Sequence, residues 1–416
     1  MPALARAAIF LVALAIPPAP ADRETPKAYT LTPPEFRKAK AFARSEFEVY
    51  FGSEALDLLA LAALVRFGAA RRLRIWAGSI APRRFLQAWL VVPPILFTVA
   101  IAELPLDAYA ETVSRLYGQS IEGWAPWFAD WAKGQALAIV VGTLALWGVY
   151  ALMRRTPSRW WLYAWLASLP LQVAAVAAMP LVVEPLFFHF DPLAQRHPRL
   201  AADIERLLHR AGVAIPPGRL LEMRASDKTN SLNAYVSGFG PSKRVVLYDT
   251  IVAKENGPPL LTTVGHELGH YVLHHIRDGL LFGFALSLLV IWAVAFTLRR
   301  LYPRDEADWD SLPSLLLIAS LAAFFLSPPI NAFSRRQERE ADVYSIEITH
   351  GIVAHSGEAA AQAFQIEGAS SFADPSPNPL AVFWLYSHPP IAERLRFSLD
   401  YDPWKRGAAP RYVSRP

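Results

Sequence analysis

The chain has 416 residues, of which 53% are hydrophobic and only 19% are charged, and it contains no cysteine. Its apolar content excludes a disordered chain, and the grouping of apolar residues in long runs argues against a soluble globular protein. The lack of cysteine excludes disulfides, cysteine metal ligands and a thiol nucleophile. The formal net charge of +5 is explained by arginines at membrane interfaces. Nucleic-acid binding is not expected, because the sequence has no basic stretch with interleaved aromatic residues.

The N-terminal apolar run covers residues 3–16 and precedes the small-residue pattern Ala19-Pro20-Ala21. It is either a cleaved signal peptide or a first membrane helix. Further segments have the roughly 17–25 mostly apolar residues that a membrane-spanning helix needs. They are residues 50–65, 85–102, 135–153, 160–183, 279–298 and 312–333. Segment 50–65 is the weakest, because either Glu54 and Asp57 line a wet cavity or the membrane helix begins after them.

Two stretches are expected to be water-soluble, residues 188–278 and residues 334–416. In the first, apolar spacing predicts a helix over 198–213 and another over 258–277, which leads toward the membrane segment at 279. Alternating and β-branched residues predict short strands at 219–223, 232–237 and 245–248.

The predicted helix from residue 258 contains the sequence His266-Glu267-Leu268-Gly269-His270, an HExxH motif. Residues four apart lie on one helix face, so both imidazoles can bind one zinc ion. Zinc lowers the pKa of a bound water toward about 7, and Glu267 can accept its proton as a general base. A histidine-rich solvated helix face is the alternative interpretation.

Catalytic zinc needs a third protein ligand. The extended HExxHxxGxxH motif would require histidine at position 276, where the chain has Ile276. A straight helix cannot wrap three turns around one ion, so His274 and His275 are expected at the surface. Glu338 and Asp342, four residues apart on a predicted helix, are better candidates. Glu338 can bind the metal while Asp342 orients a ligand imidazole from behind.

Membrane topology supports this assignment. Only the segments 279–298 and 312–333 separate His270 from Glu338. Two crossings return the chain to the side of the membrane that it left, so both residues lie on one face. An odd number of crossings would have excluded the site.

The sequence resembles the type I CAAX prenyl proteases, which are integral-membrane zinc metalloproteases, over about residues 35–400. The HExxH motif alone occurs in many unrelated proteases, whereas the ordered set of motifs with a membrane hairpin between the ligands is specific. The motifs are residues 184–187, 233–235, 243–250, 266–270, 334–342 and 387–390, together with Arg394.

The resemblance implies a mainly α-helical, multi-pass fold: a seven-helix membrane barrel around a chamber, closed by a zincin-like α+β domain with a small sheet. The expected division has a signal-like segment or first membrane helix at 1–21, membrane helices 2–5 at 22–187 and membrane helices 6 and 7 at 279–333. The zincin domain is expected in two parts. The first part is 188–278, and the second part, which carries the third zinc ligand, is 334–416.

The resemblance also implies one zinc ion per chain, with Glu338 rather than Glu340 as third ligand. Asn233 and His388 are expected to face the scissile bond, with Arg394 nearby. Such side chains are suitable donors to an oxyanion. The strand carrying Asn233, Ala234, Tyr235 and Val236 would pair with an extended peptide substrate.

Three functions follow as hypotheses from these observations. The first is a zinc metalloendopeptidase in the lipid bilayer, acting at the C-terminus of prenylated CAAX-type substrates. The second is a broad-specificity membrane quality-control protease, because the residues themselves indicate only peptide hydrolysis. The third is a non-catalytic membrane scaffold stabilised by zinc; Glu267 argues against it, since a structural site needs no base and is normally closed.

Arginine distribution addresses the membrane orientation. Three loops on one side of the membrane are arginine-rich, which by the positive-inside rule puts them in the cytoplasm and the zinc site on the opposite, extracytoplasmic face. The arginines are Arg71, Arg72, Arg74, Arg83 and Arg84; Arg154, Arg155 and Arg159; and Arg299, Arg300 and Arg304. The basic residues Arg37, Lys38, Lys40 and Arg44 favour the cytosolic face that eukaryotic members of the resembled family use.

Overall fold

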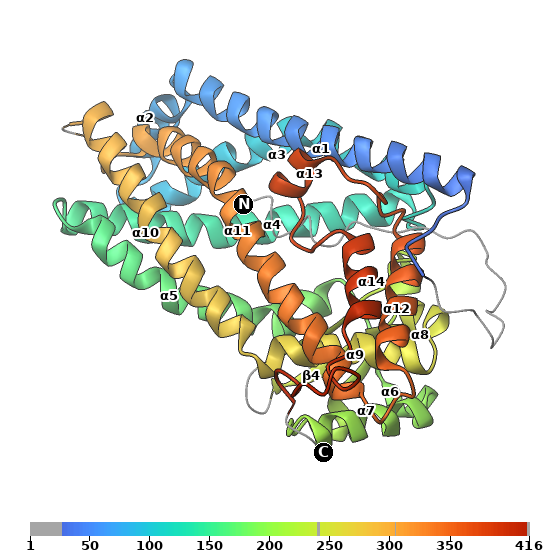
Figure 1. The fold of residues 1–416 in the computed structure, drawn as a ribbon. Helices are drawn as coiled ribbons and strands as arrows, with labels where there is room; N and C mark the ends of the chain where they lie inside the picture. Colours follow the sequence, from blue (N-terminus) through green and yellow to red (C-terminus); the bar gives the residue numbers. More distant parts are fainter. Residues whose placement is uncertain (1–26, 239–241, 304, 414–416) are drawn as a thin grey trace.

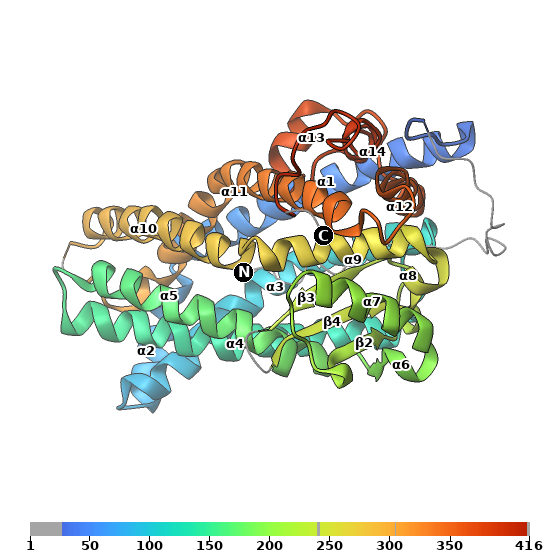
Figure 2. The ribbon, with the colours of Figure 1, turned by 60° about the horizontal axis from the view of Figure 1, so that its bottom comes forward.

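The computed structural model describes residues 27–238, 242–303 and 305–413 (Figure 1). The N-terminal apolar run and Ala19-Pro20-Ala21 lie outside the described residues. Long helices form a bundle, and a small sheet with its covering helices lies at one end of that bundle (Figures 1 and 2). The fold is mainly helical with one four-stranded sheet, as expected.

Five helices of the described chain are long and apolar enough to cross a membrane. They confirm the predicted segments from residue 85 onward, although most extend further. They are α3 (Arg84–Leu116), α4 (Trp124–Arg155), α5 (Trp160–Ala178), α10 (His275–Leu301) and α11 (Leu312–Thr349). A π-helical turn at Met179–Val183 and a 3-10 turn at Glu184–Leu186 continue α5.

Helix α1 (Pro33–Arg66) contains the weak segment 50–65 and packs along α3 and α11. Glu54 and Asp57 lie inside this helix rather than before it, and Asp57 is buried. The bundle of α1 and the five apolar helices is compatible with the seven-helix barrel that the resemblance implies.

The arginine-rich connections meet at the end of the bundle away from the sheet (Figure 1). The stretch expected to be a loop after α1 contains the helix α2 (Ala69–Ile80). Arg74 pairs with Asp310 at 2.7 Å, and Arg299 donates to the carbonyl of Ser158 at 2.8 Å. Ion pairs and backbone hydrogen bonds therefore join these connections into one basic face.

The sheet contains β1 (Phe190–Pro192), β2 (Leu220–Met223), β3 (Ala234–Ser237) and β4 (Arg244–Tyr248) in the order β1-β2-β4-β3. The three predicted strands are confirmed; β1 was not predicted, because three residues ending in proline carry no periodic signal. Strand β2 runs parallel to β4, and β3 pairs antiparallel with β4, with Tyr235 opposite Val246. Strand β3 is therefore an edge strand, and no other strand of the described residues pairs with its outer edge.

The remaining helices are α6 (Leu193–Arg196), α7 (Pro198–Arg210), α8 (Asp249–Lys254), α9 (Pro258–Val272), α12 (Ser356–Ser370), α13 (Pro379–Trp384) and α14 (Ile391–Asp400). Of these helices, α6, α7, α8 and α9 pack around the sheet, whereas α12, α13 and α14 lie beyond α9 and against α11 (Figure 2). Leu207, Leu247 and Leu268 are fully buried in the core between the sheet, α7 and α9.

The predicted helix 258–277 is wrong in one respect, because the chain breaks within it. Helix α9 ends at Val272, and α10 begins at His275. Between them His274 adopts a left-handed conformation with φ of 61°, which a non-glycine residue rarely adopts. The break turns the chain from α9 into the membrane helix.

Helices α9 and α11 pack closely because α9 presents glycines to its neighbour. A Cβ atom on Gly269 would lie 3.1 Å from Ala341 Cα, and one on Gly265 would lie 3.2 Å from Ile348 Cγ2. Helix α11 also runs without interruption through Pro328 and Pro329. The predicted membrane segment 312–333 and the residues after it thus form one helix that reaches α9.

Candidate active site

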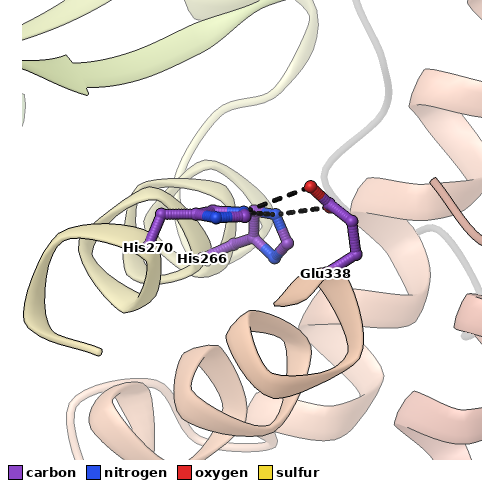
Figure 3. A group of neighbouring side chains, drawn as sticks. All are labelled: His266, His270 and Glu338. Carbon is purple, nitrogen blue, oxygen red and sulfur yellow. Dashed lines mark hydrogen bonds and ion pairs between the residues drawn. The ribbon is translucent and has the colours of Figure 1, made fainter. Parts of the chain in front are cut away.

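Three side chains from two helices converge at the contact of α9 with α11 (Figure 3). The Nε2 atoms of His266 and His270, one helical turn apart, are 3.1 Å from each other. Glu338 of α11 brings its Oε2 to 3.2 Å from His266 Nε2 and its Oε1 to 3.3 Å from His270 Nε2. One ligand atom from each residue lies within 4.8 Å of the other two.

These residues have the composition and surroundings that a divalent cation requires. Two imidazoles and one carboxylate are a ligand set of catalytic zinc sites. Glu338 is only 5% exposed, and its Oε2 makes ion-pair contacts but has no hydrogen-bond partner among the described residues. Because an orphaned buried carboxylate oxygen is costly, a cation between the three side chains would satisfy it. The donor set therefore fits a metal ion.

Asp342, one turn beyond Glu338, lies behind His266. Its Oδ1 is 2.9 Å from His266 Nδ1, and Arg394 of α14 donates two hydrogen bonds to this carboxylate, of 2.6 and 3.0 Å. The Arg394 guanidinium also lies over the Phe364 ring, 4.3 Å from its centroid, which is within the roughly 6 Å of a cation–π contact. This network holds the His266 ring with Nε2 toward Glu338.

Electrostatics at His266 favour positive charge. Burial alone would lower the pKa of His266, but the Asp342 and Glu338 carboxylates raise it to about 10. Surroundings that stabilise a protonated imidazole stabilise a bound cation for the same reason.

Glu267 is half-buried beside the ligands. Burial raises the pKa of Glu267, and the neighbouring His266 and His270 oppose that rise. A raised pKa makes a carboxylate a better proton acceptor.

His388 reaches the same group from the segment between α13 and α14. Its Nε2 lies 3.3 Å from Glu338 Oε1, and its side chain is 58% exposed, so a substrate can approach it. Two α11 residues hold this segment: Arg335 donates to the carbonyls of Val382 and Tyr386, and Asn331 donates to Trp384 O at 2.6 Å.

Asn233 lies immediately before the edge strand β3, and β3 packs beside α9 (Figure 2). Its carbonyl accepts a hydrogen bond from Tyr248 N at 3.0 Å. Direct contacts thus join His266, His270, Glu338, Asp342, Arg394 and His388. Asn233 is connected to them through the packing of β3 on α9.

Glu184 connects the membrane bundle to the sheet. The Tyr235 hydroxyl of β3 donates to its Oε2 at 2.5 Å, and the Arg244 guanidinium of β4 pairs with the same oxygen. Three of the motifs that carried the family resemblance, 184–187, 233–235 and 243–250, therefore meet at this carboxylate. These contacts fix the edge strand relative to the segment that follows α5.

The prediction that His275 lies at the surface is wrong, whereas His274 is exposed as expected. His275 is only 5% exposed, and its Nδ1 is 3.0 Å from His270 Nδ1. The error follows from treating residues 258–277 as one straight helix. The sequence offers only a weak signal of this break: His274, which precedes His275, is of a residue type that occasionally adopts positive φ.

Comparisons with known proteins cover most of the chain and agree with one another. The model of peptidase family M48 matches residues 194–400, and a model described as the CAAX prenyl protease N-terminal region with five membrane helices matches residues 21–189. The chain is 32% identical over 394 residues to the metalloprotease YhfN of Bacillus subtilis, covering 92% of this chain and 89% of that protein.

Matches to more distant relatives cover a similar share of the chain. A CAAX prenyl protease 1 homolog of Arabidopsis thaliana is 24% identical over 385 residues, covering 87% of each chain. The crystal structure of S. mikatae Ste24p shares the fold, with a TM-score of 0.75 at 20% identity over 89% of each chain.

These matches favour neither the non-catalytic scaffold nor the quality-control protease among the hypotheses. A peptidase of this kind acts on peptide or protein substrates, and its apolar helices make it an integral, multi-pass membrane protein that binds a metal ion. The chain belongs to peptidase family M48, in its CAAX prenyl protease branch of membrane zinc metalloproteases.

Proposed function

We propose that His266, His270 and Glu338 hold one zinc ion per chain and that this site hydrolyses peptide bonds in C-terminal segments of prenylated CAAX-type proteins. The observation that carries the proposal is the convergence of two imidazoles and one buried carboxylate within 4.8 Å, beside the half-buried Glu267. The names of the eukaryotic relatives support the substrate class.

The chemistry that a bound zinc ion supplies is Lewis acidity, which lowers the pKa of water and polarises a carbonyl. Glu267 accepts the proton of the attacking water and later delivers it to the leaving amine. His388 and Asn233 donate hydrogen bonds to the oxygen that gains negative charge. Asp342 and Arg394 keep the His266 ring in place while the reaction proceeds.

Substrate binding follows from the free edge of β3. An extended peptide can add to this edge as a further strand, so that its backbone hydrogen bonds align the scissile bond along α9. Residues Asn233, Ala234, Tyr235 and Val236 provide that edge. Main-chain pairing is independent of side-chain identity, so selectivity for a prenyl group must come from apolar contacts.

A pair of matched peptides tests the substrate class. Burial of each methylene-sized group of the prenyl chain stabilises the bound substrate by about 0.8 kcal/mol. If four such groups are buried, kcat/KM for the prenylated peptide should be roughly 10²-fold higher than for the unprenylated one. Purified protein is incubated with a farnesylated C-terminal peptide and with its unprenylated twin, and cuts are mapped by mass spectrometry. Chelator-sensitive cleavage of both peptides at equal rates would contradict the prenyl preference and favour a quality-control protease.

We also propose that the active site faces away from the cytoplasm, because the joined arginine-rich connections lie at the opposite end of the bundle. The absence of cysteine allows clean single-cysteine labelling. In right-side-out vesicles, an impermeant maleimide is expected to label Lys405→Cys directly and Ser79→Cys only after permeabilisation. The wild-type chain is the unlabelled control, and the reverse pattern would contradict this orientation.

A further inference from the structure

We propose that His275 and Glu340 form a relay that sets the tautomer and orientation of His270 as a metal ligand. The inference rests on the proposed function, in which His270 binds zinc through Nε2. It adds two positioning residues behind His270: His275 contacts His270 at Nδ1 rather than at Nε2, and Glu340 contacts His275.

The helix break delivers His275 to this position. Because His274 turns the chain in a left-handed conformation, the next residue faces back onto α9, where His275 Nδ1 lies 3.0 Å from His270 Nδ1. The backbone is fixed as well, since Gln337 of α11 donates its Nε2–H to His275 O at 3.1 Å. The side chain of His275 is 4% exposed, so water does not compete for either nitrogen.

Glu340 occupies the other end of the His275 ring. Its Oε2 is 3.4 Å from His275 Nε2, and its Oε1 accepts a hydrogen bond of 3.1 Å from Arg336. Arg336 therefore restrains the carboxylate, which is 23% exposed. The order of groups is Arg336, Glu340, His275 and His270, ending at the metal site.

Hydrogen-bond chemistry gives this relay a direction. His275 Nε2 makes no hydrogen bond within the described chain and faces the Glu340 carboxylate at 3.4 Å. Because a carboxylate attracts an N–H group and repels a nitrogen lone pair, the proton of His275 is placed on this nitrogen. A neutral imidazole has one donor and one acceptor, which leaves His275 Nδ1 as an acceptor. His270 Nδ1 must then donate to it, and the lone pair of His270 remains on Nε2, the atom that faces His266 and Glu338.

The same helix thus supports both ligand imidazoles. Asp342 contacts His266 Nδ1 directly at 2.9 Å, whereas Glu340 acts on His270 through an intervening imidazole. Groups that orient a metal-binding histidine in this way typically contribute 10–100-fold to metal affinity. Helix α11 thus provides Glu338 as a ligand, Asp342 to orient the His266 ring, and Glu340 to orient the His270 ring through His275.

The test measures zinc affinity of the purified full-length protein by competition with a chromogenic chelator. His275→Leu removes the acceptor and should weaken zinc binding about 10–100-fold. His275→Asn retains an oxygen near the position of Nδ1 and should restore most of that affinity. Glu340→Ala should weaken binding by a smaller factor, and the adjacent exposed His274→Asn, which tolerates positive φ, is the matched control and should bind as the wild type does.

Thermal unfolding of the metal-free proteins separates positioning from folding. Glu340→Ala should unfold at the wild-type temperature without metal while binding zinc more weakly. Wild-type zinc affinity in both His275→Leu and Glu340→Ala would overturn the relay and leave the proposed function standing, and equal losses in His275→Leu and His275→Asn would overturn the acceptor role. A wild-type protein that binds no zinc would overturn the proposed function itself.

Discussion

Glu267→Gln is expected to abolish peptide hydrolysis while zinc remains bound. Glutamine has nearly the same size and shape as glutamate, but it cannot accept the proton of the attacking water. Loss of a positioned general base typically costs 10²–10⁴-fold, and burial, which raises the pKa of Glu267, makes this carboxylate a well-matched base. The measurement is kcat on a cleaved peptide, together with zinc content by elemental analysis.

Two outcomes would contradict this role of Glu267. Full activity in Glu267→Gln would exclude it as the base, and loss of zinc with loss of activity would make it a contributor to binding rather than to proton transfer. A matched control is Glu205→Gln, which changes an exposed glutamate on α7 and should leave both activity and zinc content unchanged.

Glu338→Ala is expected to remove both zinc and activity. The substitution deletes the only carboxylate in the three-residue metal group of the described chain, and two imidazoles do not complete a catalytic zinc site. It also leaves Arg394, whose Nη2 lies 3.6 Å from Glu338, with less compensating charge. Zinc affinity should therefore fall by more than the roughly 100-fold limit seen for groups behind a ligand.

The readout for Glu338→Ala is zinc affinity by chelator competition, with activity measured at saturating zinc. Glu205→Ala serves as the control of equal size change. Retention of wild-type affinity in Glu338→Ala would show that another residue completes the site and would remove the basis of the proposed zinc ligation. Recovery of activity at high zinc would instead assign Glu338 to affinity alone.

The part of the site that the sequence predicts is the part governed by local spacing and topology. His266 and His270 share a helix face because they are four residues apart, and Glu338 returns to them because two membrane crossings separate it from His270. The structure brings all three together. The apolar membrane helices could also be predicted from the sequence, because a long apolar run has few stable structures other than a membrane-spanning helix.

The unpredicted parts depend on contacts between distant segments. The break at His274 is set by how α9 and α10 each pack, and no proline or glycine marks it. The burial of His275 follows from that break. The segment carrying His388 is held by hydrogen bonds from Arg335 to Val382 and Tyr386, which no spacing along the chain specifies. Strand β1 forms only because β2 offers it an edge.

Helix α11 has a mechanical consequence for the enzyme. Its 38 residues form a rod of about 57 Å, one end of which lies among the apolar helices while the other carries Glu338. Hydrophobic mismatch between such a rod and a thinner or thicker bilayer is relieved by tilt. Because α9 packs closely on the part of this helix that carries Glu338, a change of tilt is expected to strain the contact between the two ligand-bearing helices. Turnover should therefore depend on the acyl-chain length of the surrounding lipid.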